Sequence, residues 1–421
     1  MCRVRIALAV LIAASLRIQA QDALRSALSL DPALAPRESS PVGLQPSEPH
    51  LGPVPFSLAA YIGVTYDDNF FESESNPQSD MILRGGLTVS VRWLATERSE
   101  LRFSTDIGYL HYVTHSQDSG FQVSPNSALT YSVSYADATV SFYDQFNYWR
   151  EVTTESALAN IAILPRLDNT IGARLSWEPG RWLAQVGYGH ESFLSDNAAN
   201  NYLDRSTENL FSRFGWRLAE KSETGLEASG SFTSYRVHLQ SDNRSLSIGP
   251  YADWQLRPAI HLALRGGPTV YFFDPNGTAR GSANLNSYYL GLELSHQLTD
   301  YLAYQLNLRR DVQLGLNQGS DYIEQLSIAS SLSCAVTRRI TIGASLTYEN
   351  GSQPLPVLVI GPYVFKATEH FDRLGGGPQF SWRFTDRLNA SVSYFHWQRA
   401  SDLPGRGYAE NTVSLSLGYT F

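Results

Sequence analysis

Apolar and polar residues alternate along most of this chain, and the last eleven residues show the pattern most clearly. They read NTVSLSLGYTF, in which one parity carries Val413, Leu415, Leu417, Tyr419 and Phe421 and the other carries small, mainly polar residues. Successive side chains of a β-strand point to opposite faces. The segment therefore predicts a strand with one wholly apolar face, which suits a wall with lipid outside and water inside.

Short polar turns recur along the chain at intervals of about 40 residues, which is the kind of period that marks a repeating architecture. Alternating segments flank each turn, and their far ends meet across longer stretches rich in Asn, Asp, Ser and Gly. The turns lie at residues 95–98, 135–137, 178–180, 219–222, 257–259, 299–300, 337–339 and 385–387. A solenoid would instead need a fixed core motif in each repeat.

Short turns at one end and long loops at the other are typical of outer-membrane barrels. The sequence therefore predicts an all-β fold, a transmembrane antiparallel β-barrel of about eighteen strands, with short periplasmic turns and longer extracellular loops. Tryptophan supports this prediction, because indole rings favour the membrane–water interface. Trp149 and Trp397 fall at the long-loop ends of their strands, whereas the other six lie near short turns. We expect two aromatic girdles.

Three segments make up the predicted domain organisation. Residues 1–20 have Arg3 and Arg5 before an apolar run and a small residue, Ala20, at the end, as expected of a cleaved signal peptide. Residues 21–55 form a Pro-rich periplasmic segment, since proline is excluded from sheet interiors. Residues 56–421 form the barrel. The predicted location is the outer membrane of a Gram-negative-type cell.

Composition narrows the possible functions. Charged residues make up 17% of the chain and the net charge is −8, which gives no support to nucleic-acid binding. Cys334 is the one cysteine left after the signal peptide, so an internal disulfide or a cysteine-based metal cluster is excluded. We predict no cofactor and no metal. The expected partners are outer-membrane lipid and the barrel-assembly machinery, for which Tyr419 and Phe421 would form the terminal signal.

Strand parity also separates wall from lumen. A charge on the lipid face at the bilayer midplane costs about 2–4 kcal/mol, so charged strand residues are predicted to face inward. The lumen-facing candidates are Arg84, Arg92, Arg102, Arg174, Arg265, Arg309, Arg373, Arg383, Glu227 and Glu293. Asp144 falls on the lipid parity, which predicts a bulge or an early exit from the membrane. Planar, permanently charged arginines predict a mild preference for anions. Alternatively, they pair with Glu227, Glu293 or Asp311 and stiffen the wall.

The first strand resembles that of a known family. Residues Tyr61–Phe71, YIGVTYDDNFF, are similar to the opening of the beta-barrel porin-2 family, and WRFTDRL at residues 382–388 is similar to its repeated turn. The resemblance covers residues 56–421 and implies a secreted barrel whose first strand ends at Tyr66, Asp67, Asp68 and Asn69. Some members are encoded beside exopolysaccharide secretion systems, so the resemblance implies polysaccharide export, with polysaccharide-export partners, as one candidate role.

Two features could carry chemistry. His190 and Ser192 share a strand face with the spacing by which a base reaches a nucleophile, as in outer-membrane phospholipases. No glycine-containing stretch follows the pair, and we identify no orienting Asn or Asp on a neighbouring strand, so a girdle histidine beside a serine is the simpler interpretation. The acidic residues Asp67, Asp68, Glu72, Glu74 and Asp80 could bind a divalent cation, but a solvated acidic loop is the preferred interpretation.

One apolar passage lies in the longest predicted outer loop. Pro354–Phe365, PLPVLVIGPYVF, would be an adhesive patch if exposed. We predict that it folds inward and narrows the pore. The predicted function is passage of solutes across the outer membrane. A plugged structural or adhesive barrel and a lipid-hydrolase enzyme are the alternatives, and no catalytic residue is predicted.

Overall fold

The computed structural model describes residues 50–421, except residues 125–126, 152–154, 162, 238, 275–283 and 361–362. The predicted signal peptide and almost all of the Pro-rich segment lie outside the described residues, so both remain predictions. In the described part of the chain, no helix is long and apolar enough to cross a membrane.

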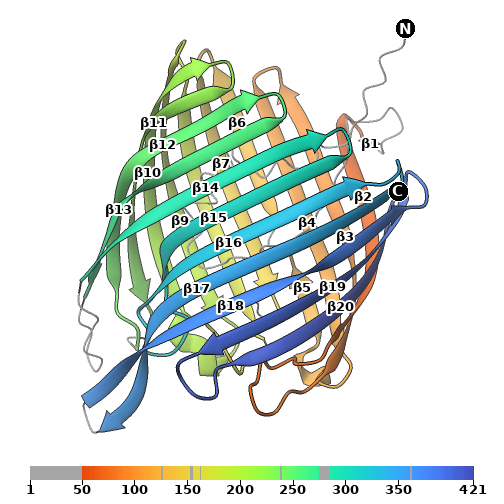
Figure 1. The fold of residues 1–421 in the computed structure, drawn as a ribbon. Coiled ribbons are helices and arrows are strands. Elements are labelled where there is room, and N and C mark those ends of the chain that lie inside the picture. The colour runs from red at the N-terminus through yellow and green to blue at the C-terminus, as the bar shows by residue number, and fades with distance from the viewer. Residues whose placement is uncertain are drawn as a thin grey trace.

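Antiparallel strands account for nearly all of the regular structure (Figure 1). The strands are β1 (His50–Leu51), β2 (Val54–Asp67), β3 (Asp80–Thr96), β4 (Ser99–Tyr112), β5 (Gly120–Val123), β6 (Ala128–Tyr135), β7 (Ala138–Trp149), β8 (Arg166–Trp177), β9 (Trp182–Ser195), β10 (Arg205–Ala219), β11 (Ser222–Tyr235), β12 (Asn243–Arg257), β13 (Ile260–Phe273), β14 (Leu285–Thr299), β15 (Leu302–Leu314), β16 (Tyr322–Ala335), β17 (Ile340–Ile360), β18 (Tyr363–Arg383), β19 (Leu388–Ser401) and β20 (Tyr408–Thr420). Two short 3₁₀-helices, η1 (Ser116–Asp118) and η2 (Ala198–Leu203), lie in the loops.

The sheet closes on itself. From β2 onward each strand pairs with the next, β5 and β6 share one position between β4 and β7, and β20 returns to pair with β2 from Thr420 opposite Ala59 to Thr412 opposite Asp67. The result is a closed barrel of 18 strands with one extra short strand, β1. The predicted fold class and strand number are confirmed, and all eight predicted short turns connect consecutive strands at one end of the barrel.

The outer surface carries the apolar parity, as predicted. In β20, Val413, Leu415 and Leu417 are exposed on the outside. The hydroxyl groups of Ser414 and Ser416 face the other way and hydrogen-bond to Thr65 and Ser391 at 2.9 and 2.7 Å. The alternation seen in the sequence therefore sorts the wall into an apolar outside and a polar inside.

Of the two predicted aromatic girdles, tryptophan contributes to the one near the short turns. Trp177, Trp182 and Trp382 are exposed on the outside near the short turns. Trp149 is only 4% exposed, and Trp397 lies beneath the guanidinium of Arg373, so both tryptophans at the long-loop end face inward. There Trp397 contacts the guanidinium of Arg373 and the ring of Phe395. Exposed tyrosines take their place on the outside: Tyr188, Tyr288, Tyr348 and Tyr394.

Of the two alternatives predicted for Asp144, the bulge is wrong, whereas an early exit from the membrane remains a prediction. Strand β7 pairs with β6 and β8 without any register shift, and Asp144 stays on the outer parity. Its carboxylate accepts a hydrogen bond from the side-chain amide of Asn169 on β8. A polar neighbour on the same face, rather than a distorted backbone, accommodates this charge.

Glycines let aromatic side chains lie flat against the inner wall. A Cβ atom added to Gly187 would come within 2.0 Å of the Phe211 ring, and one added to Gly375 within 2.1 Å of the Trp397 ring. Neither contact is compatible with any larger residue. The triple glycine at residues 375–377 therefore permits close approach from the lumen side, as its position in a strand suggests.

The family-like strand end forms part of the seam where the first and last strands meet. Asp68 accepts hydrogen bonds from both the backbone and the side-chain nitrogen of Asn411, each at 2.6 Å. The Asn69 amide donates to the carbonyls of Ser73 and Ala409, both at 2.9 Å, and accepts from the Ser73 nitrogen. Tyr66 and the terminal Tyr419–Phe421 ring pair lie outside. An assembly role for Tyr419 and Phe421 remains a prediction.

We expect Asn69→Ala to weaken this seam. The change removes three hydrogen bonds from a buried side chain, and each unsatisfied buried partner costs about 1–3 kcal/mol. The folded barrel should lose its heat-resistant migration in gel electrophoresis at a lower temperature. Asn76→Ala is the matched control, since Asn76 contacts Ser73 through its backbone nitrogen. Equal melting of the two variants would contradict the role assigned to Asn69.

Candidate functional site: the lumen and its inner loop

The loop between β7 and β8 folds into the barrel. Its described residues 155–161 and 163–165 are called the inner loop below. Ser156, Ala157, Leu158, Ala159 and Leu164 are each at most 5% exposed. A surface loop rarely buries five consecutive or near-consecutive side chains, because loops normally run over the outside. This segment instead has the burial of a core element.

The inner loop crosses the lumen. Leu158 and Leu164 pack against Phe193 on β9 and against Tyr202, Leu203 and Leu316 from two other long loops. Ile163 packs against Phe70, Ile82, Leu110 and Tyr112, which belong to the β2–β3 loop, β3 and β4. Ala157 packs against Ile323 on β16 and Phe371 on β18. Strands β4 and β16 lie on different sectors of the ring, so the segment bridges the interior.

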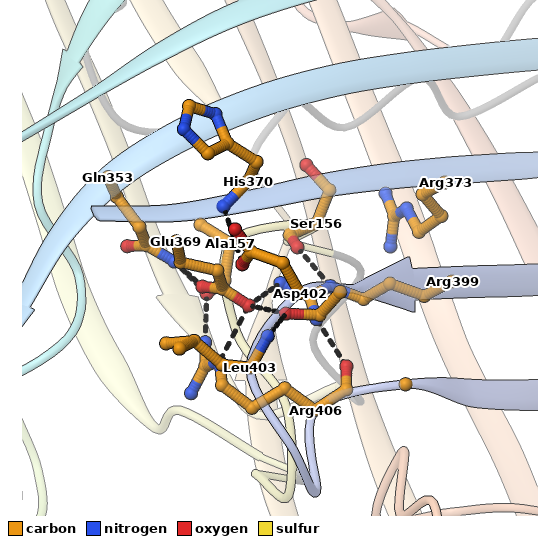
Figure 2. Close-up of polar contacts among 12 residues, drawn as sticks. Ser156, Ala157, Gln353, Glu369, His370, Arg373, Arg399, Asp402, Leu403 and Arg406 are labelled. Atoms are coloured by element: carbon orange, nitrogen blue, oxygen red, sulfur yellow. Dashed lines mark hydrogen bonds and ion pairs between the residues drawn. The ribbon is translucent and has the colours of Figure 1, made fainter. Parts of the chain in front are cut away.

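A buried polar cluster holds the inner loop at its centre (Figure 2). The carbonyl oxygen of Ala157 accepts hydrogen bonds from Asn317 at 2.9 Å and from Gln353 and Arg406 at 2.8 Å each. The carbonyl of Ser156 accepts from Nε of Arg399 at 2.8 Å. The loop backbone is therefore fixed to β17, β19 and two neighbouring loops.

Glu369 on β18 organises these donors. Its side chain is fully buried, and its carboxylate accepts from Arg399 and Arg406 at 2.8 Å, from Ser401 at 2.7 Å and from Gln353 at 2.8 Å. The two guanidinium groups have more N–H donors than the carboxylate can accept. The remaining N–H groups of Arg399 and Arg406 donate to the carbonyls of Ser156 and Ala157. We call Glu369, Arg399, Arg406 and Gln353 the latch.

The segment predicted to narrow the pore does not do so. Pro354–Phe365 extends β17 and β18 as a hairpin, with Pro354 opposite Thr368 and Ile360 opposite Tyr363, and it projects beyond the barrel end (Figure 1). Its run of β-branched and aromatic residues favours strand pairing over a compact inward loop. The inner loop enters the barrel interior instead, and its sequence SALANIAILP at residues 156–165 is also largely apolar.

The described residues line at least two cavities within the barrel. The larger, of about 550 Å³, is lined by Arg84, Glu151, Glu349, Arg373 and Glu410 among others, and also reaches Ser156 of the inner loop. The smaller, of about 180 Å³, is lined by Glu227, Arg265, Glu293, Arg309 and Tyr289 among others. The structure thus brings six of the ten predicted lumen residues to cavity walls.

Most of these arginines have carboxylate partners. Arg265 pairs with Glu293 at 3.4 Å, Arg213 with Glu227 at 3.1 Å, and Arg309 with Asp311. Arg373 pairs with buried Glu349 at 2.7 Å, and Arg84 with Glu151 at 3.7 Å. The paired arrangement is the alternative that the sequence left open, and it reduces the net field that a passing anion would meet.

The remaining predicted lumen arginines lie apart from these cavities. Arg92 and Arg102 both bind Glu100 near a short turn. Arg174 is 8% exposed on the inner parity of β8, and Arg383 ends β18 beside the turn to β19. These four therefore line the wall but do not form one site with the others.

The acidic residues of the first long loop are divided among separate contacts. Asp80 accepts from the backbone of Met81 and Thr114 and from His115, whose ring stacks on Phe70. Among the described residues, no group of three or more His, Cys, Asp or Glu side chains could hold a metal ion. Glu72, predicted to be solvated, is instead 1% exposed, because the inner loop and β20 cover it.

Burial raises the pKa of Glu72 to about 8, although Arg373, Tyr408 and Arg399 act in the opposite direction and Asp67 adds to the rise. The Tyr408 hydroxyl donates to one carboxyl oxygen at 3.0 Å. The backbone carbonyl of Glu72 accepts from Asn160 of the inner loop at 3.3 Å. Glu72 therefore contacts β20 through its carboxyl group and the inner loop through its backbone.

Glu208, the acid beside His190, was not predicted from the sequence. The β9–β10 register sets Glu208 directly opposite His190, and its Oε1 lies 2.7 Å from His190 Nδ1. Ser192 Oγ lies 3.3 Å from His190 Nε2. All three residues are on the outer parity, away from the lumen. Only the pairing register, which the sequence does not reveal, brings Glu208 to this position.

Comparison with known proteins does not place the chain in a family. No family model and no curated protein matches it. Among solved structures, Pseudomonas aeruginosa OccK2 (OpdF) has a TM-score of 0.49 and 12% identity over 88% of this chain and 98% of that one. Pseudomonas aeruginosa OpdK has a TM-score of 0.49 and 10% identity over 89% and 100%. Pseudomonas aeruginosa OprD has a TM-score of 0.48 and 10% identity over 87% and 95%. The resemblance to the beta-barrel porin-2 family remains a hypothesis.

Glu72 predicts a pH-dependent loop. Because its pKa in the folded state is raised above the unfolded value, the folded loop holds more protons, and its stability falls as pH rises from about 4.5 to about 8. Backbone hydrogen exchange in residues 68–79, corrected for intrinsic rates, should accelerate between pH 6 and pH 9. Glu72→Gln should remove this dependence, with Glu74→Gln as the matched control. A wild-type loop with pH-independent protection would contradict this account.

Proposed function

We propose that the protein is an outer-membrane channel for small polar solutes, narrowed by the inner loop. The observation that carries this proposal is a closed barrel with an apolar outer wall and polar cavities on its inside. Barrels of this size leave an aqueous interior unless a segment plugs them. The long loops would face the outside of the cell and the short turns the periplasm.

The inner loop favours small solutes over a polymer. It bridges the lumen and is latched by buried charged groups, so an extended polysaccharide would have to displace it. Only the sequence resemblance to the beta-barrel porin-2 family supports polysaccharide export. A plugged structural barrel is the second candidate, and the bridging contacts of the inner loop favour it over an adhesive one.

Single-channel conductance of the refolded protein in a planar bilayer tests the proposal. We expect small, stable current steps from the wild type. Arg399→Ala should give larger and noisier steps, because breaking a buried ion pair costs about 3–5 kcal/mol and frees the inner loop. Arg244→Ala, which alters an exposed pair with Asp274, is the matched control. A wild-type barrel that carries no current, and stays closed in Arg399→Ala, would support the plugged alternative.

Ion selectivity tests the lumen charges separately. Arg265→Ala leaves Glu293 without its partner in the smaller cavity, so the reversal potential in a salt gradient should shift toward cation preference. Glu293→Gln should shift it toward anion preference by releasing Arg265. The gradient is best kept near physiological salt, where the screening length is about 8 Å. Shifts of the same sign in both variants would contradict a lumen balanced by this pair.

A further inference from the structure

A polar patch lies on the outer wall across strands β7 to β10. We define the outer patch as Asp144, Asn169, His190, Ser192 and Glu208. All five lie on the parity of exposed apolar residues such as Phe142, Ile171, Val186 and Leu210. The register sets Ser192 opposite Asn169 on one side and opposite Ser206 on the other. These contacts lie outside the barrel, so the channel function does not use them.

Within the outer patch, three residues have the connectivity of a nucleophile, a base and an orienting acid. Glu208 accepts from His190 Nδ1 at 2.7 Å, which fixes the imidazole tautomer with its proton on Nδ1. Nε2 is then free to accept the hydroxyl proton of Ser192, 3.3 Å away. The same order of contacts activates serine in hydrolases of unrelated folds, and apo contacts of this kind are often long.

The outer patch lies toward the long-loop end of the apolar wall, the level at which the ester groups of a surrounding bilayer would lie. Between the outer patch and the short turns, the wall is apolar as far as Trp182 and Trp216, whose rings are 4.3 Å apart. On the other side of the patch, the polar long loops begin. Tyr188, whose ring is exposed and whose hydroxyl donates to Glu208, marks the interface at this level. Acyl chains lying along Ile171 and Leu210 would bring their ester carbonyls to the height of Ser192.

Two related clusters on the same girdle show what is particular to this one. On β17 and β18, Tyr348 and Asn350 both donate to Asp372. On β19 and β20, Tyr394 and His396 both contact Asn411. These clusters share the Tyr-x-polar arrangement and anchor the girdle. The first has an amide in place of the imidazole, and the second has Gln398 in the position of Ser192. Base, acid and hydroxyl group come together on β9 and β10.

We propose that Ser192, His190 and Glu208 form a hydrolytic site for acyl esters of membrane lipids. Ser192 Oγ attacks the ester carbonyl carbon while His190 Nε2 takes its proton. The bond to the lipid alcohol breaks, His190 returns the proton to the departing oxygen, and the acyl group stays on Ser192. Water, deprotonated by His190, then releases the fatty acid and restores the serine. Ser192 and His190 are the catalytic residues, and Glu208 is a positioning residue.

The test uses the refolded full chain in detergent with a long-chain alkyl fluorophosphonate, which reacts covalently with activated serines. We expect labelling of the wild type at Ser192, identified by peptide mass, and none in Ser192→Ala or His190→Ala. Glu208→Gln should slow labelling more than tenfold, and Glu208→Asp should restore part of the rate, whereas a purely structural carboxylate would affect neither. The wild type, but not Ser192→Ala, should then release fatty acid from phosphatidylcholine in mixed micelles.

Ser206→Ala is the matched control, since Ser206 lies on the same face of the neighbouring strand. It should label at the wild-type rate, and every variant should keep its heat-modifiable migration and its conductance. A folded wild type that does not label, or labelling that persists in Ser192→Ala, would overturn the proposal. Labelling that is indifferent to Glu208→Gln would overturn the positioning role of Glu208. Labelling without fatty-acid release would exclude membrane lipid as the substrate.

Discussion

The closure of the sheet between β2 and β20 is the constraint on which the rest of this structure depends. An apolar wall that faces lipid has no water to satisfy its backbone groups, so every strand must find a partner on both sides. The antiparallel register supplies those partners around the whole ring. Once the ring is closed, each residue is assigned inside or outside by parity, and the two surfaces can acquire separate chemistries.

Closure also creates the interior that the inner loop fills. A segment that enters a ring can touch strands far apart in the chain, which is why Ala157 meets Gln353 and Arg406 at sequence separations of 196 and 249 residues. Buried charge is tolerated at Glu369 because two guanidinium groups and two further donors surround it. Removing one partner is costly, so the latch gives the loop one well-defined position.

The alternation and the turns could be predicted because they are local. Leu415 and Ser416 are neighbours in a strand and so point to opposite faces regardless of the tertiary structure. A short polar turn such as residues 385–387 is recognised from its own residues. The inner loop, the latch and Glu208 could not be placed, because each depends on which strands meet and in what register. The sequence has two apolar runs that could fold into the barrel, residues 156–165 and Pro354–Phe365. They differ in strand propensity, which favours strand pairing for Pro354–Phe365.

Polar residues on the outer wall depend on their neighbours in the sheet. Asp144, His190 and Glu208 lie on the apolar face, where a tyrosine hydroxyl and a neighbouring amide pair with the two carboxylates and Glu208 pairs with His190. A girdle needs hydrogen-bonded polar groups, and the hydrogen bond from Tyr348 to Asp372 is an example of such a pair. Chemistry requires one more condition, a titratable base in contact with a hydroxyl group. That condition is met where Ser192 follows His190 two residues later on the same strand face. A hydrogen-bonded girdle cluster and the proposed hydrolytic site therefore differ by one side chain.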